Sequence, residues 1–297
     1  MTYDERLTKV VPHERQFRFQ QLEFYAFIHF TVNTFTDREW GDGSESPRIF
    51  NPERLDPEQW VKAVKSAGMR ELILTCKHHD GFCLWPSQYT RHTVAASPWK
   101  NGRGDVVKET AEACISVCGP DIRWCGNEAG HTRISGWSVV PERAKDSEIV
   151  SEKSQHCDDV KFRQRKVGAG DSDWGSRAIL KDEDKLIWYP AEVNTSISPG
   201  WFWHACEDDK VRSLGELVHI YNNSVGGNAT FLLNIPPTRD DLFHENDVRR
   251  LAELGEYIRN MFRTNLLEGA HLSCLHCFKG KYSLQPARRK LYHRGGA

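Results

Sequence analysis

Residues 70–82 decide the fold class, because they read Arg70-Glu-Leu-Ile-Leu-Thr-Cys76 and continue at once with Lys77-His-His-Asp-Gly-Phe82. The first half is short and apolar and predicts a buried strand. A helix is predicted just before it, with Asp56 as its cap, Pro57 in its first turn and Gly68 at its end. This succession of helix and strand predicts a parallel sheet in an α/β fold.

The same alternation continues in both directions from this stretch. An apolar strand is predicted over Phe24–Phe30, after a polar leading segment. A long polar stretch, residues 141–184, is interpreted as a mobile loop or insertion. The predicted helix 105–114 runs into the predicted strand Ile115–Cys118 without turn residues, which is abnormal and suggests a lost segment. The other predicted elements are strands at 186–189, 192–197 and 229–235 and helices at 214–225 and 248–262.

Composition narrows the class of protein. The 297 residues carry a formal net charge of −1, and 39 % are apolar, so a packed core is expected and nucleic-acid binding is not. No stretch approaches the roughly 18 apolar residues of a membrane span, and the beginning of the chain shows no apolar secretory segment. Nine cysteines with irregular spacing predict reduced thiols and a cytoplasmic location. The ten tryptophans suit either a large core or the faces of sugar rings.

Three histidines stand at the ends of predicted strands: His29 closes the first, and His78 and His79 follow the second. Ligands bind at this end of parallel strands, and imidazoles can exchange hydrogen bonds with vicinal hydroxyls. One of them could instead be a core histidine. Zinc is the other alternative, but Gly81-Phe82 adds no ligand beside them. A second metal-like cluster in the tail lacks a partner pair, so neither a metal nor a cofactor is predicted; its members are His271, Cys274, His276 and Cys277.

Two acidic positions are candidates for sugar chemistry. Glu39-Trp40 lies in a loop after the first strand, where an indole can stack on a sugar and a carboxylate can accept from its hydroxyls. Glu128 is flanked by glycines in Gly126–Gly130, a tight loop that would fix a general acid in place. An ordinary exposed glutamate is the alternative for Glu128.

Several motifs together resemble glycoside hydrolase family 29, in chain order over about residues 16–266. The resemblance is strongest to its branch selective for α-1,3/1,4-linked fucose. The motifs are Phe27-Ile-His-Phe30, Glu39-Trp-Gly41, Leu74-Thr-Cys-Lys-His-His-Asp-Gly-Phe-Cys-Leu-Trp85, Gly104-Asp-Val-Val107, Gly119-Pro-Asp-Ile-Arg-Trp124, Gly126-Asn-Glu-Ala-Gly130, Pro190-Ala-Glu-Val-Asn-Thr-Ser-Ile197 and Pro199-Gly-Trp-Phe-Trp-His204.

The resemblance implies a catalytic (β/α) barrel that hydrolyses terminal α-L-fucosides with retention of configuration. It implies that His29, His78 and His79 bind fucose hydroxyls together with Glu39 and Trp40. Glu128 matches the acid/base carboxylate. The implied partner is a fucosylated oligosaccharide or glycoconjugate, with no nucleic acid and no membrane involved.

The sequence departs from the family in one place. The family has two further strands between Val107 and Gly119, one ending in a Tyr-Leu-Ser-Pro-Trp-like run and one in a Trp-Phe-Asp-Gly-like run whose Asp is the nucleophile; neither run occurs here. About 100 residues are missing by the size of a normal barrel. Asp80 and Asp121 are the nearest carboxylates in sequence, but neither matches the nucleophile motif.

The sequence therefore predicts an incomplete (β/α)8 TIM-like barrel with about six of eight strands over residues 1–266. Residues 267–297 are predicted to be an irregular tail, without the C-terminal sandwich usual in the family. We expect low stability and little turnover. Three readings stay open: a weakened fucosidase, a sugar-binding protein without chemistry, and a truncated product without a stable fold. The gap itself can be biological or an artefact of the gene sequence.

Overall fold

The computed structural model describes residues 6–113, 122–124, 128, 130, 138–145, 148–149, 167–168 and 180–264. The chain divides into two compact units, residues 1–261 and 262–297, and the fold described here belongs to the first. Its α-helices are α2 (Glu14–Gln20), α3 (Val32–Thr36), α4 (Pro57–Ser66), α5 (Val106–Ala113), α8 (Leu214–Ser224) and α9 (Glu245–Met261). Short 3-10 turns are η1 (Pro47–Ile49), η2 (Val94–Ala96), η3 (Trp99–Gly102), η4 (Glu142–Ala144) and η6 (Ala205–Glu207). Within the described ranges no helix has the length and apolar character needed to cross a membrane.

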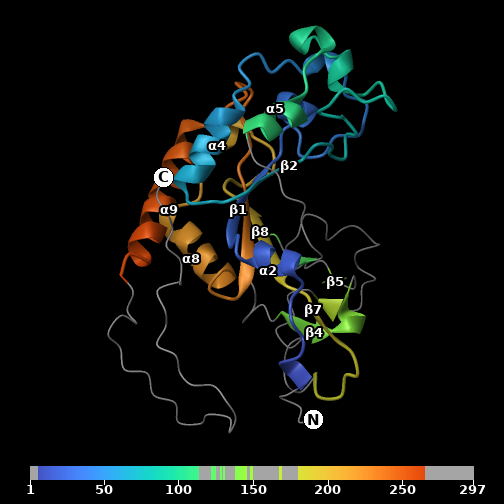
Figure 1. Cartoon of the computed structure of the whole chain (residues 1–297). Helices are drawn as coiled ribbons and strands as arrows, with labels where there is room; N and C mark the ends of the chain where they lie inside the picture. Colours follow the sequence, from blue (N-terminus) through green and yellow to red (C-terminus); the bar gives the residue numbers. More distant parts are fainter. Residues whose placement is uncertain are drawn as a thin grey trace. The chain divides into compact units, whose positions relative to one another are not determined.

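A five-stranded sheet with the order β2-β1-β9-β8-β3 forms the centre of this unit, and all its strands are parallel (Figure 1). The strands are β1 (Phe24–Ile28), β2 (Leu72–Leu74), β3 (Arg123–Trp124), β8 (Ala191–Ser196) and β9 (Ala229–Asn234). Among the described residues β2 and β3 are the two ends of the order, so the sheet is an open portion of a (β/α) barrel. It has five described strands where the sequence predicted about six.

The hydrophobic core lies between this sheet and its helices. Alternate residues of β1 and β9, such as Ile28 and Leu233, point into it and are fully buried. Trp60 of α4 packs in the same cluster and donates its Nε1–H to the carbonyl of Asp241 at 3.0 Å. Figure 1 shows α4, α9 and α8 next to one another on this side of β1. The core therefore fixes β1 and β9 from the outer face and leaves their other face to the interior of the barrel.

The interior face of the sheet begins with an aromatic cluster at the amino ends of the strands. Phe19 of α2 packs edge-on against Tyr25, with ring centroids 5.5 Å apart. The Tyr25 hydroxyl donates a hydrogen bond to Glu192, whose pKa is raised to about 7 by burial. One period further along the same face come Phe27 and Asn194. The interior of the sheet is therefore closely packed at the amino ends of its strands. Polar side chains lie further along, toward the carboxyl ends.

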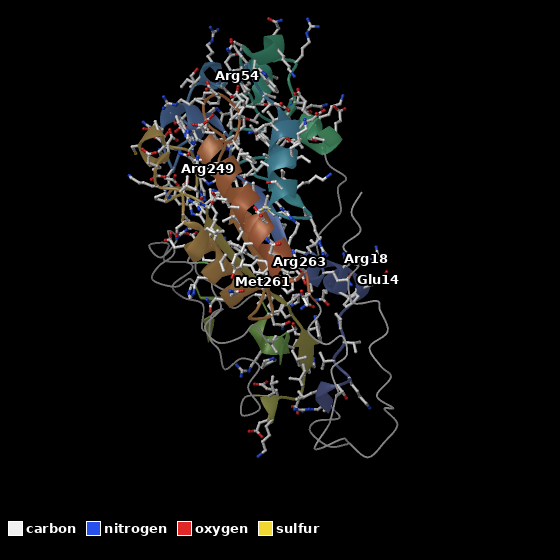
Figure 2. All side chains as sticks on the ribbon, turned by 90° about the vertical axis from the view of Figure 1, so that its left-hand side faces the viewer. Glu14, Arg18, Arg54, Arg249, Met261 and Arg263 are labelled. Carbon is white, nitrogen blue, oxygen red and sulfur yellow. The ribbon has the colours of Figure 1, made fainter. Side chains whose placement is uncertain are left out.

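Local sequence signals explain the helices well. The predicted start and end of α4 are confirmed: the Asp56 carboxylate accepts the Gln59 N–H at 3.1 Å, Pro57 is the first helical residue and Gly68 adopts φ +82° after the helix. On the outer surface, charged side chains face outward, as Glu14 and Arg18 of α2 and Arg249 of α9 show (Figure 2). Exposed pairs such as Glu14–Arg18 add little stability.

The predicted strand at 186–189 is confirmed, but it does not belong to the central sheet. Leu186–Trp188 forms β7, which pairs antiparallel with β4 (Val139–Pro141) in a separate two-stranded sheet. Only Tyr189 and Pro190 separate β7 from β8, whereas a parallel crossover needs a dozen residues or more. Two neighbouring strands of one parallel barrel cannot be joined by so short a connection.

Several sequence predictions fall on residues that the structure does not describe. They include the strand Ile115–Cys118 and the tail 267–297. Of the long polar stretch 141–184, only short pieces are described, among them the parallel pair β5 (Glu148–Ile149) and β6 (Val167–Gly168). The short strand β3 lies in a stretch for which the sequence predicted no strand.

Candidate active site

A cavity of about 250 Å³ lies at the carboxyl end of the sheet. His29 directly follows β1 and Thr75 directly follows β2, so the strand ends themselves bring side chains to it. The remaining lining residues come from the loops after the strands, from β8 and, in the case of Phe27, from β1 itself. The full lining is Phe27, His29, Glu39, Trp40, Thr75, His78, His79, Glu128, Asn194 and Trp201.

All six residues that the sequence singled out line this one cavity. They are His29, Glu39, Trp40, His78, His79 and Glu128. Their convergence is a structural fact, while the roles assigned to them stay predictions. The aromatic rings are close together: the centroids of His29 and His78 are 5.5 Å apart, and those of Trp40 and His79 are 4.6 Å apart. The cavity therefore combines flat apolar faces with hydrogen-bonding groups, as sites for sugar rings require.

His29 is the buried residue at the floor of the cavity, and Asn234 is its hydrogen-bond partner. Its Nδ1 lies 2.8 Å from Asn234 Oδ1. The Asn234 Nδ2 group donates to Ser196 Oγ and to the Trp201 carbonyl, each at 2.9 Å, and this fixes which end of the amide faces His29. Nδ1 of His29 must therefore donate, and its Nε2 is left as an acceptor for a ligand hydroxyl.

Burial keeps this histidine uncharged. His29 is 7 % exposed, and burial lowers its pKa to about 3 although the hydrogen bond to Asn234 works in the other direction. The neighbouring His78 also opposes a charge on it. At neutral pH the floor of the cavity therefore presents a neutral imidazole with a defined tautomer.

Glu39 belongs to the outer wall of the cavity, which consists of the loop 37–45 and the loop 198–208. Its carboxylate accepts the backbone N–H groups of Trp201 and Phe202, each at 3.0 Å. A third contact at 2.8 Å joins its Oε1 to Nε2 of His204. Much of the acceptor capacity of Glu39 is used within the protein, so it anchors the second loop as well as facing the cavity.

The other ring nitrogen of His204 contacts a second carboxylate. Its Nδ1 lies 2.6 Å from Oδ1 of Asp37. Partial burial lowers the pKa of His204, but the hydrogen bonds to Asp37 and Glu39 outweigh it and raise that pKa above its ordinary value. His204 therefore favours the charged form, in contrast to His29.

Glu128 reaches the cavity from the side of Trp201. The indole Nε1–H of Trp201 points to Glu128 Oε2 at 3.4 Å. A carboxyl group at the edge of a pocket, next to an indole, is suitably placed for proton transfer to or from a leaving oxygen. Asn194 lines the cavity from β8, where its alternation with Ser196 brings both to the interior face.

Asp80, which the sequence offered as a neighbouring carboxylate, has a different position. It is buried, accepts from the Thr31 hydroxyl at 2.9 Å and from the Phe82 N–H at 2.6 Å, and does not line the cavity. Burial raises its pKa despite these bonds. Asp80 connects the loops after β1 and β2 and does not present a free carboxylate. Asp121 lies outside the described residues.

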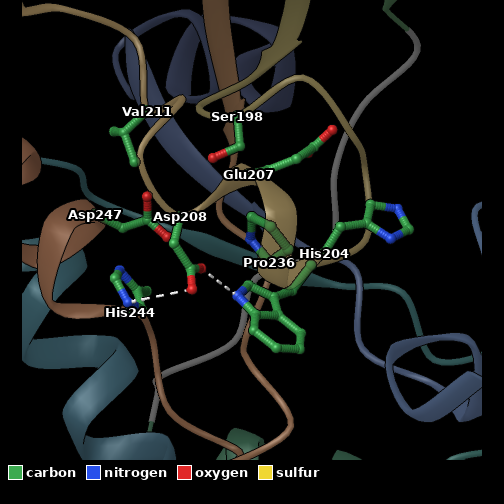
Figure 3. A pocket seen from close by; sticks show the side chains of 9 residues that line it. Ser198, His204, Glu207, Asp208, Val211, Pro236, His244 and Asp247 are labelled. Carbon is green, nitrogen blue, oxygen red and sulfur yellow. Dashed lines mark hydrogen bonds and ion pairs between the residues drawn. The ribbon is translucent and has the colours of Figure 1, made fainter. Parts of the chain in front are cut away.

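A much smaller pocket lies beside the second loop of the wall (Figure 3). Asp208 joins its parts: it accepts from Trp203 Nε1 at 2.7 Å and pairs with His244 at 3.7 Å. Asp247 is buried there, and burial raises its pKa to about 7. These contacts connect η6 to the start of α9.

Sequence reasoning assigned no role to Trp201, Asn194, Asn234 or His204. Trp201 and His204 stand in a quoted motif, so the tryptophan-rich run after β8 was an available signal. Among the described residues no group of three or more His, Cys, Asp or Glu side chains is arranged to hold a metal ion. The tail cluster around His271 and Cys274 is outside the described part.

Comparison with known proteins places these features in a family. The sequence model of the family described as Alpha-L-fucosidase matches residues 2–119 and residues 116–261. Alpha-L-fucosidase 1 of Arabidopsis thaliana is 32 % identical over 344 aligned positions, which include 89 % of this chain and 63 % of the plant protein. The chain thus spans somewhat less than two thirds of the length of this relative.

Solved structures show the same likeness. A glycoside hydrolase 29 family member from an unknown rumen bacterium has a TM-score of 0.71 and 32 % identity, covering 89 % of this chain and 60 % of the other. A Ruminococcus gnavus fucosidase of the same family, solved in complex with fucose, has a TM-score of 0.68 and 26 % identity, covering 87 % and 69 %.

Proposed function

The chain belongs to the alpha-L-fucosidase family, and from this premise we propose that its cavity binds a terminal α-L-fucosyl group with Glu128 as the acid/base carboxylate. The observation that carries the proposal is the convergence of six side chains on one cavity of about 250 Å³. That volume is below the ~300–1,000 Å³ of pockets for drug-sized ligands and suits a single sugar ring. The fucose complex of the Ruminococcus gnavus relative supports the same ligand.

Each group has a chemical task in this proposal. The neutral His29 accepts a sugar hydroxyl through Nε2, and His78 and His79 exchange hydrogen bonds with neighbouring hydroxyls. Trp40 and Trp201 supply flat faces for the C–H side of the ring. Glu128 gives its proton to the leaving glycosidic oxygen. The natural substrate is then a fucosylated oligosaccharide or glycoconjugate.

Turnover is expected to be low. Retention needs a second carboxyl group about 5 Å from the first, which attacks the anomeric carbon. Of the described carboxylates on the cavity, Glu39 is occupied by three donors, and the nucleophile run of the family does not occur in the sequence. In the part of the chain that the structure describes, the proposed acid/base Glu128 is therefore not joined by a carboxylate ready to attack the anomeric carbon.

Two findings support a missing block as the cause. The family matches the chain in two stretches that meet at residues 116–119, next to the abrupt Cys114/Ile115 join. The alignment with the Arabidopsis relative covers 344 positions, more than the 297 residues of the whole chain. The relative thus has residues inside the aligned region that this chain does not have.

A second function follows from the same geometry. A protein that retains the hydroxyl-binding groups but has one catalytic carboxylate binds fucose without cleaving fucosides. Two observations favour this alternative. Glu39 already accepts hydrogen bonds within the protein, among them one from His204, and Asp80 accepts one from Thr31 and does not line the cavity.

The two functions are separated by measuring L-fucose binding by calorimetry and hydrolysis of an aryl α-L-fucoside. The proteins are the wild type, Glu128→Gln and the control Glu58→Gln, whose side chain is 76 % exposed on α4. Loss of hydrolysis in Glu128→Gln with retained binding supports the enzyme, and binding without hydrolysis in all three supports the binding protein. A wild-type protein that does neither contradicts the proposal.

A reducing, cytoplasmic location is part of the proposal. It is supported by the free thiols of Cys76, Cys83 and Cys206 among the described residues. Thiol labelling of the protein isolated under non-reducing conditions tests it, because disulfide-linked cysteines would not be labelled.

A further inference from the structure

A series of hydrogen bonds, joined through the covalent structure of Trp201, connects the protein surface with Glu128. It starts at Asp37, whose side chain is 55 % exposed, and passes through His204 to Glu39. Glu39 holds the backbone of Trp201, and the indole of Trp201 contacts Glu128. The series therefore joins the predicted acid/base to a titratable group at the outer wall.

The protonation state of His204 follows from its two contacts. Nδ1 lies 2.6 Å from a carboxylate oxygen of Asp37, and Nε2 lies 2.8 Å from one of Glu39. Ionised carboxylates only accept hydrogen bonds, and a neutral imidazole has one N–H to donate. Only the imidazolium satisfies both contacts, each as a charge-assisted hydrogen bond.

The second loop of the wall is built closely around this pair. A Cβ at Gly200 would lie 2.5 Å from Glu39 Oε1 and 2.9 Å from His204 Cδ2, so the backbone approaches the carboxylate where no side chain fits. Directly after it, Trp201 and Phe202 donate their N–H groups to Glu39. A displacement of the Glu39 carboxylate therefore changes the position of Trp201.

We propose that His204 is a positioning residue, which as an imidazolium holds the Glu39 carboxylate and thereby the Trp201 indole that faces Glu128. His204 itself does not line the main cavity, and Figure 3 shows its ring directed away from the Asp208–His244 pair. The consequence for sugar binding rests on the proposed function. The consequence for Trp201 does not.

Among the described residues, the charged and titratable groups near His204 come from three places. Some belong to its own loop, some to the loop after α3 and some to the start of α9. They are Asp37, Glu39, Glu207, Asp208, His244 and Asp247. The Asp208 carboxylate is already engaged by Trp203 and His244, which leaves Asp37 and Glu39 as the direct partners of the ring. Partial burial lowers the pKa of His204, but the hydrogen bonds to Asp37 and Glu39 outweigh it and raise the pKa above its ordinary value.

The test uses the indole N–H resonance of Trp201 in the sugar-free protein, assigned by its absence in Trp201→Phe. In the wild type this resonance shifts as pH rises above 6.5, because deprotonation of His204 removes one of its two hydrogen bonds. The shift is absent in His204→Gln and retained in His219→Gln, a change of an exposed histidine on α8. A wild-type resonance that does not titrate, or one that titrates unchanged in His204→Gln, overturns the proposal.

A second variant keeps the test decisive if His204→Gln does not fold. Asp37→Asn changes an exposed side chain and removes one charge next to the ring, so the midpoint of the Trp201 titration moves to lower pH. An unchanged midpoint overturns the proposal.

Sugar binding gives the functional readout. His204→Gln is expected to weaken L-fucose binding about tenfold, the effect of one lost charge-assisted contact, with the difference largest below the midpoint. A wild-type protein that titrates at Trp201 but binds no fucose contradicts the proposed function and leaves the positioning role supported. Equal affinity of His204→Gln and wild type contradicts a role of His204 at the sugar site.

Discussion

The floor of the cavity and its outer wall are each organised by a histidine, and the two are in opposite protonation states. In the floor, His29 is buried and its partner is the neutral amide of Asn234, so the pKa falls to about 3. In the wall, His204 lies between two carboxylates, so its pKa rises. The partner of the ring decides the outcome: an amide orients a neutral acceptor toward a ligand, and carboxylates stabilise a cation that holds a loop.

The largest expected effect is in the floor. Asn234→Leu removes the acceptor of His29 Nδ1 and the donor of both Ser196 Oγ and the Trp201 carbonyl. Leaving buried polar groups without partners costs about 1–3 kcal/mol each, so we expect the free energy of unfolding to fall by about 3 kcal/mol or more. Urea unfolding measures it.

Asn222→Leu serves as the control, because Asn222 is an exposed asparagine on α8. We expect this change to stay within about 0.5 kcal/mol. A cost below about 1 kcal/mol for Asn234→Leu would show that the floor does not depend on this amide.

The next effect is a pH dependence of stability that separates the two histidines. The folded-state pKa of His29 is below that of the unfolded chain, so the unfolded state binds more protons between pH 6.5 and about 3. Its contribution to stability is therefore lost as pH falls, by up to about 1.4 kcal/mol per pH unit. Relative to His29→Gln, the wild type should lose about 2 kcal/mol between pH 6.5 and 4.5.

The sign for His204 is opposite. Its folded-state pKa is raised, so its stabilising contribution is complete below the unfolded pKa of about 6.5 and is lost as pH rises through the folded value. The comparison with His29→Gln is needed because Glu192, Asp241 and Asp247, whose pKa values are raised to about 7, favour the folded state at low pH. Parallel pH curves for wild type and His29→Gln would refute the neutral floor.

The smallest expected effect is steric and lies in the wall. A Cβ at Gly41 would be 2.6 Å from Asp80 Cβ and 2.6 Å from Asn33 Oδ1. Gly41→Ala should therefore cost about 1–2 kcal/mol of unfolding free energy and weaken fucose binding through the adjacent Trp40. Gly215→Ala is the matched control, because nothing lies within 4 Å of its added Cβ and alanine favours the helix. Equal melting temperatures for the two variants would contradict the tight packing of the wall.

Local signals in the sequence were sufficient for much of the fold. The cap of α4 at Asp56 and the apolar run of β1 were predicted from neighbouring residues alone, and the rule that ligands bind at strand ends selected His29 and His78. The strand at Leu186–Trp188 was also predicted, but periodicity does not show the direction in which a strand pairs. The available signal was the connection of only two residues between β7 and β8, which is too short to join parallel neighbours.

The partners of the site residues were not predictable in the same way. His29 and Asn234 are 205 positions apart, and His204 and Glu39 are 165 apart, so no local pattern joins them. Their contacts arise because β1, β8 and β9 are neighbours in a parallel sheet. The tautomer of His29 and the charge of His204 are consequences of tertiary structure and appear only once these strands are paired.

The pairing of β1 with β9 also has a consequence for biosynthesis. Ribosomes add about 5–20 residues per second, so the 205 positions between His29 and Asn234 correspond to roughly 10–40 s of translation. During this time β1 has emerged while one of its two neighbours does not yet exist, and its apolar strand presents an unsatisfied edge. Until the codons for β9 have been read, this edge of β1 is open to pairing with other chains.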